Sequence, residues 1–527
     1  MTAELARAGG LVAALGLAVL LVGARRDVRL AGLAVLALGA APLAVYLAPQ
    51  GRERALAAAA PLAVYLAPEG RERALAAAAP VGLLLAAALA FAFRRHPWLL
   101  PMAALACVPA RIPVDIGSEE ANLLLPLYGV IAAAGLALAW ELVHGEGPER
   151  ELGLLAWPLG AFVAWSGVSL LWTDDLRQGG ISLLAFYLPF GLLAVCLARL
   201  EWSRRWLGAL CAQLGIMAIA FAAIGIYQWL TGEVFWNRKV IVGNVYAPFH
   251  RVNSVFWDPS IYGRFLVVAI LAGLVVVLYG AGARAALAAA AGIAVVWTGL
   301  LFSFSQSSFV ALMAGVLATA AFAWRWRVAA SLAAVAAAAL AVSFAAPPIR
   351  NALADDVRSG LNKASSNRFD LVTNGLEIAA DHPVFGVGLG GFKRAYAEAT
   401  GLRGREPKTA ASHNTPITVA AELGLPGFLL LAWLLGAAFV AQFRRASRSF
   451  AGRASLVFGL AFVAIVVHSL FYNALFEDPM TWGLLGLSAV AYAWRTSPAR
   501  QAAPLLRGEP ARSELPRRER VPHEAAP

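Results

Sequence analysis

Long apolar runs, separated by short polar stretches, extend along almost the whole chain. A helix needs about 20 apolar residues to cross the hydrocarbon core of a bilayer, and most of these runs reach that length. From the C-terminus backwards, they predict helices over residues 481–495, 453–472, 416–442, 328–346, 306–323, 284–301, 259–279, 206–230, 179–198, 153–172, 121–143 and 74–93, with a shorter one at 97–109. The pattern therefore predicts an all-α, polytopic integral membrane protein with roughly 12–15 transmembrane helices.

The composition agrees with this class. Hydrophobic residues make up 60% of the chain and charged residues 14%, whereas about a quarter of a typical soluble domain is charged. The first apolar segment, Leu11–Val22, lacks a small-residue cleavage site followed by a polar region, so it predicts a retained helix rather than a signal peptide. Cys107, Cys196 and Cys211 all fall in apolar runs, and their spacing indicates neither a disulfide framework nor a metal site.

The net charge of +12 comes mostly from arginines that stand in short clusters between the apolar runs. This distribution is typical of the positive-inside rule rather than of nucleic-acid binding. It places the Arg444–Arg453 loop and a Pro-, Arg- and Glu-rich tail, 496–527, in the cytoplasm, and we expect the tail to be disordered. The loops 231–258 and 347–415 are then extracytoplasmic, and the second of them is large and partly helical.

Three regions follow from this organisation: N-terminal transmembrane helices over 1–230, a catalytic membrane region over 231–495, and the tail. Within the first region, residues 42–60 are repeated at 61–79 with a single difference, Gln50 against Glu69. The apolar stretch between the copies, Ala55–Pro68, is too short to span a membrane comfortably. We interpret it as an interfacial or re-entrant segment that carries no function.

The first outer loop leads into a helix through Arg251 and the sequence Asp258-Pro259-Ser260. Asp258 or Ser260 can cap that helix, with proline in its first turn. Arg264 lies further along the helix and has two possible roles. One is to extend its charge towards lipid headgroups, and the other is to bind phosphate or diphosphate oxygens, which the planar guanidinium matches well.

The second outer loop contains Arg368 at the start of a predicted amphipathic helix, whose apolar side would be formed by Leu371, Leu376, Ile378 and Ala379. The glycines that follow match G-x-G-x-x-G at Gly386, Gly388 and Gly391. A dinucleotide site is excluded because no strand precedes the motif and an outer loop meets no NAD. We expect these glycines to let the backbone approach the membrane or a phosphate closely.

His413 and Asn414 end the long polar loop, directly before the apolar run 415–440. A histidine where a water-facing loop meets the bilayer can accept a proton beside a lipid-borne substrate. The alternative is that His413 only caps a helix or contacts headgroups.

Taken in order, these motifs resemble the O-antigen ligase and O-antigen polymerase superfamily of bacterial membrane glycosyltransferases. The resemblance covers about 245–490 and lies in Arg251 with Asp258-Pro259, the serine-rich turn 303–308, the Asp-His-Pro and glycine segment 381–392, and His413-Asn414 followed by Glu422. Glu477-Asp478-Pro479 also resembles the end of the family. Gln306 is a departure, because many members carry arginine there.

The resemblance implies transfer of a glycan from undecaprenyl diphosphate to a hydroxyl of an acceptor glycan or glycolipid, on the outer face of the bacterial cytoplasmic membrane. His413 matches the histidine that activates the acceptor hydroxyl. Arg251 and Arg368 match arginines that hold the diphosphate, and Arg264 is a further candidate. Asp258, Asn414 and Glu422 would support the site. The resemblance implies no cofactor and no metal, and a lipopolysaccharide core or another lipid-linked glycan as acceptor.

General chemistry is compatible with these roles. An outer-face enzyme has no nucleotide sugar, so the lipid diphosphate must be the leaving group, and arginines can neutralise its charge. A histidine of ordinary pKa suits a general base. Besides a ligase or a polymerase, a transporter or flippase of lipid-linked glycans remains open, although the expected inverted repeats are not evident. A non-catalytic scaffold would leave the arginines and the histidine unexplained.

Overall fold

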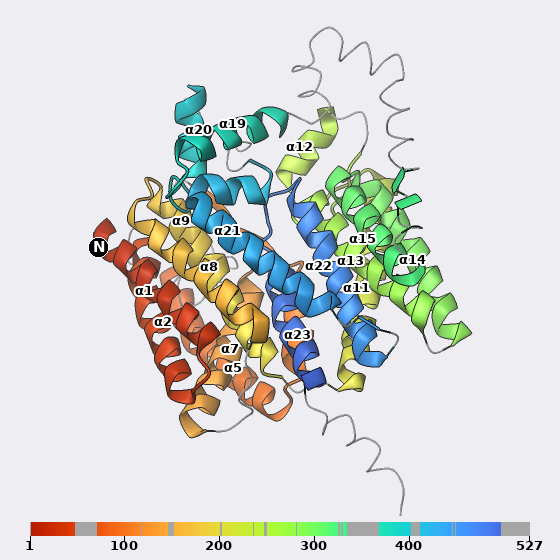
Figure 1. The fold of residues 1–527 in the computed structure, drawn as a ribbon, viewed down its shortest axis with the longest axis horizontal. Helices are drawn as coiled ribbons and strands as arrows, with labels where there is room; N and C mark the ends of the chain where they lie inside the picture. Colours follow the sequence, from red (N-terminus) through yellow and green to blue (C-terminus); the bar gives the residue numbers. More distant parts are fainter. Residues whose placement is uncertain are drawn as a thin grey trace, which may run out of the picture.

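The computed structural model describes residues 2–47, 71–116, 119–145, 152–200, 203–235, 237–246, 250–280, 282–324, 327, 330–331, 333–334, 368–401, 412–444, 446–447 and 449–496. The predicted helix 328–346, the interfacial segment Ala55–Pro68 and the tail from 497 onwards fall wholly or mostly outside these residues. Within them the protein is a bundle of long helices (Figure 1), which confirms the predicted all-helical, polytopic class.

Most of the N-terminal half lies on the left side of the bundle in Figure 1, whereas its last helix, Arg204–Thr231, lies on the right. Its elements are α1 (Ala3–Val22), α2 (Arg26–Leu47), α5 (Arg71–Arg95), α6 (Leu99–Cys107), β1 (Ile112–Ile116), β2 (Glu119–Leu123), α7 (Leu125–His144), η1 (Gly153–Leu155), α8 (Ala156–Val168), η2 (Ser169–Leu171), α9 (Leu176–Ile181), the π-helical η3 (Ser182–Tyr187), α10 (Leu188–Ala198) and α11 (Arg204–Thr231).

The C-terminal half contributes the remaining elements: α12 (Arg238–Tyr246), α13 (Pro259–Tyr279), α14 (Ala283–Ser303), α15 (Gln306–Trp324), α19 (Arg368–Asp381), α20 (Phe392–Thr400), α21 (Thr415–Phe443), α22 (Phe450–Ser469) and α23 (Pro479–Thr496). Most of the predicted helix ranges agree with these bounds to within a few residues.

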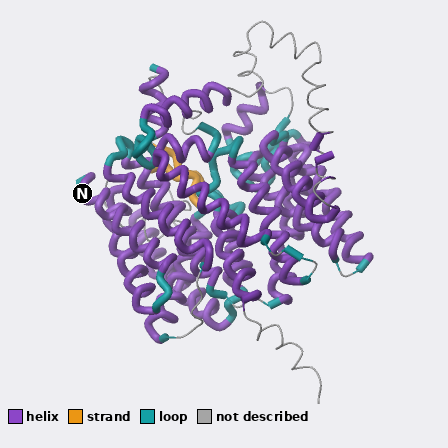
Figure 2. Tube along the Cα trace, viewed as in Figure 1, coloured by secondary structure: helices purple, strands orange, loops and turns teal. Residues whose placement is uncertain are grey.

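Eleven helical segments within the described residues are long and apolar enough to cross a membrane, and two of them, Gly153–Leu171 and Leu176–Ala198, each combine three consecutive elements. They expose large hydrophobic side chains on their outer faces, as a lipid environment requires. The sequence did not predict the hairpin of β1 and β2, which pairs antiparallel with Ile112 opposite Leu123 (orange in Figure 2). Because of this hairpin, α7 begins at Leu125 rather than at 121.

Two helices of the large loop, α19 and α20, lie across one end of the bundle, at the top of Figure 1. Leu371 and Ile378 of α19 and Phe392 and Tyr396 of α20 form a small apolar cluster with Ala421 of α21. The predicted amphipathic helix is therefore confirmed, but Leu376 is 53% exposed and does not belong to its buried side. The cluster holds the loop helices against the start of α21.

Candidate functional site

A polar cavity of about 240 Å³ lies at the loop-bearing end of the bundle, where several chain segments converge. The lining comes from α9 and η3, from the glycine segment before α20, from the start of α21, and from the connection between α22 and α23. These residues are Gln178, Ser182, Tyr187, Leu389, Gly390, His413, Thr415, Thr418, Val419, Glu422, Leu423 and 472–477. Residues from both halves of the chain therefore line this cavity.

His413 lines this cavity in a conformation that non-glycine residues seldom adopt. Its φ is +57°, in the left-handed region, where a side chain costs about 1–3 kcal/mol unless its surroundings fix it. The neighbouring hydrogen bonds supply that constraint. Ser412 Oγ accepts from the Asn414 N–H at 3.1 Å and lies 2.9 Å from Thr418 Oγ1. Such strain is typical of functional sites, because it aims one side chain at the expense of local stability.

Asn414 is the N-cap of α21, where its Oδ1 accepts from the Ile417 N–H at 3.1 Å. Its Nδ2 donates to the carbonyl of Leu470 at 3.1 Å, and Thr415 Oγ1 donates to Asn473 Oδ1 at 2.8 Å. The cap therefore serves two purposes. It ends the long loop at a defined residue, and it fixes the α22–α23 connection beside His413.

Glu422 lies on the cavity side of α21, just before a break in the helix. Gly424 has φ +66° and ψ −168°, and Pro426 has no N–H to donate to the carbonyl of Glu422. That carbonyl accepts instead from the Gly388 N–H at 2.8 Å, while the Ala421 carbonyl accepts from the Val387 N–H at 2.9 Å. The break in α21 thereby creates the docking edge for the glycine segment.

Gly386 shows why the docking edge needs glycine. Its φ is +66°, and an added Cβ would lie 2.4 Å from the backbone of Glu422. The glycine segment therefore approaches α21 of the same chain closely, whereas the sequence predicted approach to the membrane or a phosphate. On the cavity side, the carboxylate of Glu422 accepts from the Phe392 N–H at 3.4 Å.

The connection between α22 and α23 brings in Glu477, which sequence reasoning did not assign to the site. The Arg111 guanidinium donates to its carbonyl at 2.9 Å. Glu477 is half-buried, and burial raises the pKa of its carboxyl above the ordinary value, while Arg111 and Arg264 oppose this shift. Burial likewise raises the pKa of Tyr472, with Asp258 adding to the effect. In the sequence, only the Glu-Asp-Pro string pointed to this segment, through its resemblance to the end of the O-antigen ligase and polymerase superfamily.

The predicted arginines occupy three different positions. Arg251 is half-buried beside the turn after α14, where its Nε donates to the Ser303 carbonyl at 3.2 Å. Arg264 is 1% exposed and pairs with Asp478 at 2.9 Å. Neither is among the residues that line the cavity. Arg368 begins α19, but its side chain lies outside the described residues.

Asp258 caps a helix, as the sequence predicted. It is the N-cap of α13 and accepts from the Ser260 N–H at 2.6 Å, with Pro259 in the first turn.

Of the residues predicted for the site, the structure brings His413 and Glu422 into one cavity, with Asn414 beside them. Arg251 and Arg264 lie outside its lining. Gln178, Ser182 and Tyr187 were missed because they sit in the N-terminal half, within a run that hydropathy alone described.

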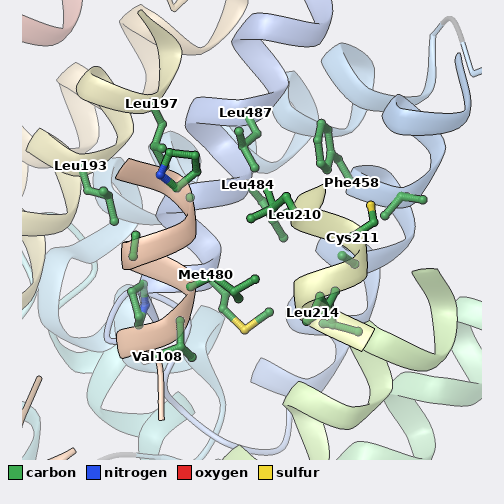
Figure 3. Close-up of a pocket in the computed structure, with 18 residues that line it drawn as sticks. Val108, Leu193, Leu197, Leu210, Cys211, Leu214, Phe458, Met480, Leu484 and Leu487 are labelled. Atoms are coloured by element: carbon green, nitrogen blue, oxygen red, sulfur yellow. The ribbon is translucent and has the colours of Figure 1, made fainter. Parts of the chain in front are cut away.

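A second, almost wholly apolar cavity of about 120 Å³ lies among α6, α10, α11, α22 and α23 (Figure 3). Met480 projects into it, with Leu193 and Leu197 on one side and Leu210 and Leu214 on the other. Met480 follows Glu477 by only three positions. One short segment therefore contributes to a polar cavity and to an apolar one.

The fold and cavity define a multi-pass membrane protein with a polar site built from loop and helix ends. Residues 266–432 match the family described as O-antigen ligase, and this match supports an assignment to the O-antigen ligase and polymerase superfamily. The match includes Arg368, His413 and Glu422. Arg251, Arg264 and Glu477 lie outside it.

The chain also resembles an apolipoprotein N-acyltransferase from Rhizobium meliloti (strain 1021). The two are 30% identical over 199 residues, which are 33% of this chain and 35% of that protein. The similarity thus spans about a third of the relative's length, and it does not carry the relative's activity over to this chain.

Proposed function

We propose that this protein transfers a glycan from a polyprenyl diphosphate, of the undecaprenyl type, to a hydroxyl group of an acceptor glycan or glycolipid on the outer face of the bacterial cytoplasmic membrane. The observation that carries the proposal is His413, held at φ +57° on the wall of a polar cavity, within the region that matches the O-antigen ligase family. Glu422 and Glu477 supply carboxylates in the same cavity.

In the proposed reaction, the acceptor hydroxyl oxygen attacks the anomeric carbon of the donor sugar, and the bond to the diphosphate oxygen breaks. His413 takes the hydroxyl proton, and the lipid diphosphate leaves with the bonding electrons. A single displacement of this kind inverts the anomeric centre. Glu422 and Glu477 are suited to accept hydrogen bonds from sugar hydroxyls and so to orient the acceptor towards His413.

Leaving-group stabilisation falls to arginines in this proposal. Arg251 and Arg368 hold the diphosphate, and no divalent metal is required. Arg264 has a different role from the one expected, because its guanidinium is buried against Asp478. It holds the α22–α23 connection, and Arg111 holds the same connection through the carbonyl of Glu477.

The apolar cavity supports a lipid-linked substrate. It begins at Pro479 and Met480, directly after the segment that lines the polar cavity, and presents only hydrocarbon side chains over most of its wall. A substrate with a charged diphosphate and a polyprenyl chain needs both surfaces close together. A polymerase of the same superfamily would use the same chemistry with a lipid-linked acceptor.

The experiment is glycan transfer from a purified undecaprenyl-diphosphate glycan in the presence of a chelator. His413→Ala should lower the rate about 10²–10⁴-fold, as loss of a general base does, while donor binding persists. His382→Ala is the matched control, because that histidine is exposed and outside the cavity lining. Full activity of His413→Ala, or a strict need for added metal, would contradict this mechanism.

The same assay tests the donor site. Arg251→Lys should also impair transfer, because a point charge does not replace the planar guanidinium. Reporter fusions test the face of the membrane, with one after Gly401 expected outside and one after Arg448 inside. Finding both reporters on one side would refute the proposed orientation.

A further inference from the structure

A separate, mostly apolar cavity that contains one pair of charged residues lies about one helix length away from the proposed active site. Its volume is about 160 Å³, and its lining includes Phe93, Leu100, Ala137, Glu141, Cys196 and Arg199. Tyr187, at the start of α10, lines the active-site cavity, whereas Arg199 directly follows the end of α10. At about 1.5 Å per helical residue, the two positions are roughly 18 Å apart along the axis.

Arg199 is the unusual group in this second cavity. Its side chain is 7% exposed, and Oε2 of Glu141 lies 3.7 Å from its Nη2. The Nε and Nη1 atoms are buried and have no hydrogen-bond partner among the described residues. A buried guanidinium costs several kcal/mol unless acceptors satisfy its donors. A ligand that places further acceptor oxygens inside the cavity would satisfy the donors of this arginine.

The surroundings indicate the depth of the cavity in the membrane. It lies where α5, α7 and α10 end and where α11 begins. Trp98 stacks on Trp206 at 4.9 Å, and the guanidinium of Arg94 lies 4.6 Å from the ring centre of Trp140. Tryptophan and arginine gather at the level of lipid headgroups. The cavity is therefore at headgroup depth, on the opposite side from the proposed active site.

We propose that this cavity binds the phosphate group of a membrane phospholipid. Arg199 supplies donors to the phosphate oxygens, which its guanidinium matches in charge and geometry. The apolar wall formed by Phe93, Leu100 and Ala137 accommodates the first part of an acyl chain. Glu141 holds one edge of the guanidinium and, by repelling the phosphate, weakens its binding.

The test is lipid binding by the purified full-length protein, measured by native mass spectrometry with phosphatidylglycerol and with diacylglycerol of the same chain length. We expect saturable binding of phosphatidylglycerol and none of diacylglycerol. Arg199→Gln should weaken binding about tenfold or more, as loss of a hydrogen bond to a charged group does. Arg205→Gln, at an exposed arginine of α11 that is not among the residues lining the cavity, should change binding less than about twofold.

Two further variants keep the test decisive if Arg199→Gln does not fold. Ala137→Leu fills the cavity without touching a charge and should abolish saturable binding. Glu141→Gln removes the repulsion and should tighten binding. Diacylglycerol binding as tight as that of phosphatidylglycerol would overturn the proposal, as would unchanged binding in Ala137→Leu. Displacement of the lipid by inorganic phosphate at equal concentration would also overturn it, because the site would then recognise the free ion.

Discussion

The polar cavity around His413 and the apolar cavity around Met480 share one chain segment but are built differently. The polar lining comes from irregular backbone: the cap of α21, the π-helical turn of η3, the glycine segment and the α22–α23 connection. The apolar lining comes almost entirely from regular helix faces. Regular helices satisfy their own backbone and present side chains only, whereas broken ones also expose N–H and carbonyl groups.

The difference shows where polar chemistry can be placed in a membrane protein. The break at Gly424 leaves carbonyls of α21 without helical partners, and the glycine segment satisfies them. Glu422 is then held by hydrogen bonds with the backbone of the glycine segment rather than by packing alone. In the apolar cavity the helices need only fit one another. The two cavities should therefore respond differently to substitution.

The largest effect is expected from the ion pair that fixes the shared segment. Arg264→Met leaves Asp478 buried without its cation and should destabilise the protein by about 3–5 kcal/mol, with loss of transfer. Arg394→Met is the matched control, because its ion pair with Glu398 at 3.1 Å is exposed and screened by solvent, so its loss should change the stability very little.

Denaturant unfolding in detergent measures both effects. The double variant Arg264→Met with Asp478→Leu should recover most of the stability, because no buried charge then remains unpaired. Equal stabilities for Arg264→Met and Arg394→Met would show that the segment is not held by this pair.

The second prediction concerns the docking of the glycine segment. Gly386→Ala places a Cβ 2.4 Å from the Glu422 backbone, so the segment must move. A shift of about 1 Å at a site costs on the order of 10²-fold in rate. Gly401→Ala has the same φ of +66° but meets nothing within 4 Å, so it isolates backbone strain from the clash. Initial transfer rates decide the matter, and similar losses in both variants would argue against docking as the cause.

Sequence reasoning succeeded where one periodic signal determined the structure. Helix ranges such as 259–279 follow from apolar run length, and the cap by Asp258 follows from residue type and position. His413 and Glu422 were singled out because they stand at a loop end and in a string that resembles the family, and both line the polar cavity. These features are local, so no knowledge of tertiary contacts was needed.

The remainder of the site depends on contacts between distant segments. Nothing in the sequence around Gln178 or Arg111 indicates that these residues approach Glu477 or His413. The ion pair of Arg264 with Asp478 joins positions more than 200 residues apart, so sequence reasoning considered only lipid headgroups or phosphate as partners of the arginine. The docking of the glycine segment was missed for the same reason, because its partner is a helix break further along the chain.

The third prediction probes the apolar cavity. Ala104→Leu reduces the volume of this cavity. The ratio of activity with a long-chain polyprenyl donor to activity with a short-chain donor should therefore fall, by about tenfold or less, because burying one methylene group of the donor contributes about 0.8 kcal/mol. Ala294→Leu, on the exposed face of α14, should leave that ratio unchanged. The ratio of kcat/KM for the two donors is the measurement. A fall in rate that is equal for both donors would mean that the cavity does not hold the lipid chain.

The smallest expected effect is on the pH dependence of stability. It distinguishes the polar cavity, which contains carboxyl groups, from the apolar one. Burial raises the pKa of Glu477 above its ordinary value of 4.5, so the folded protein holds this proton more tightly than the unfolded chain does. The resulting stability is fully present below pH 4.5 and is lost as pH rises through the folded-state pKa. Glu477→Gln should therefore flatten the decline in stability above pH 4.5. Met480→Leu, in the apolar cavity, should leave the profile unchanged, because the described residues that line this cavity include no carboxyl group. Unfolding midpoints between about pH 4 and 8 test this, and a parallel decline in wild type and Glu477→Gln would assign the pH dependence to another group.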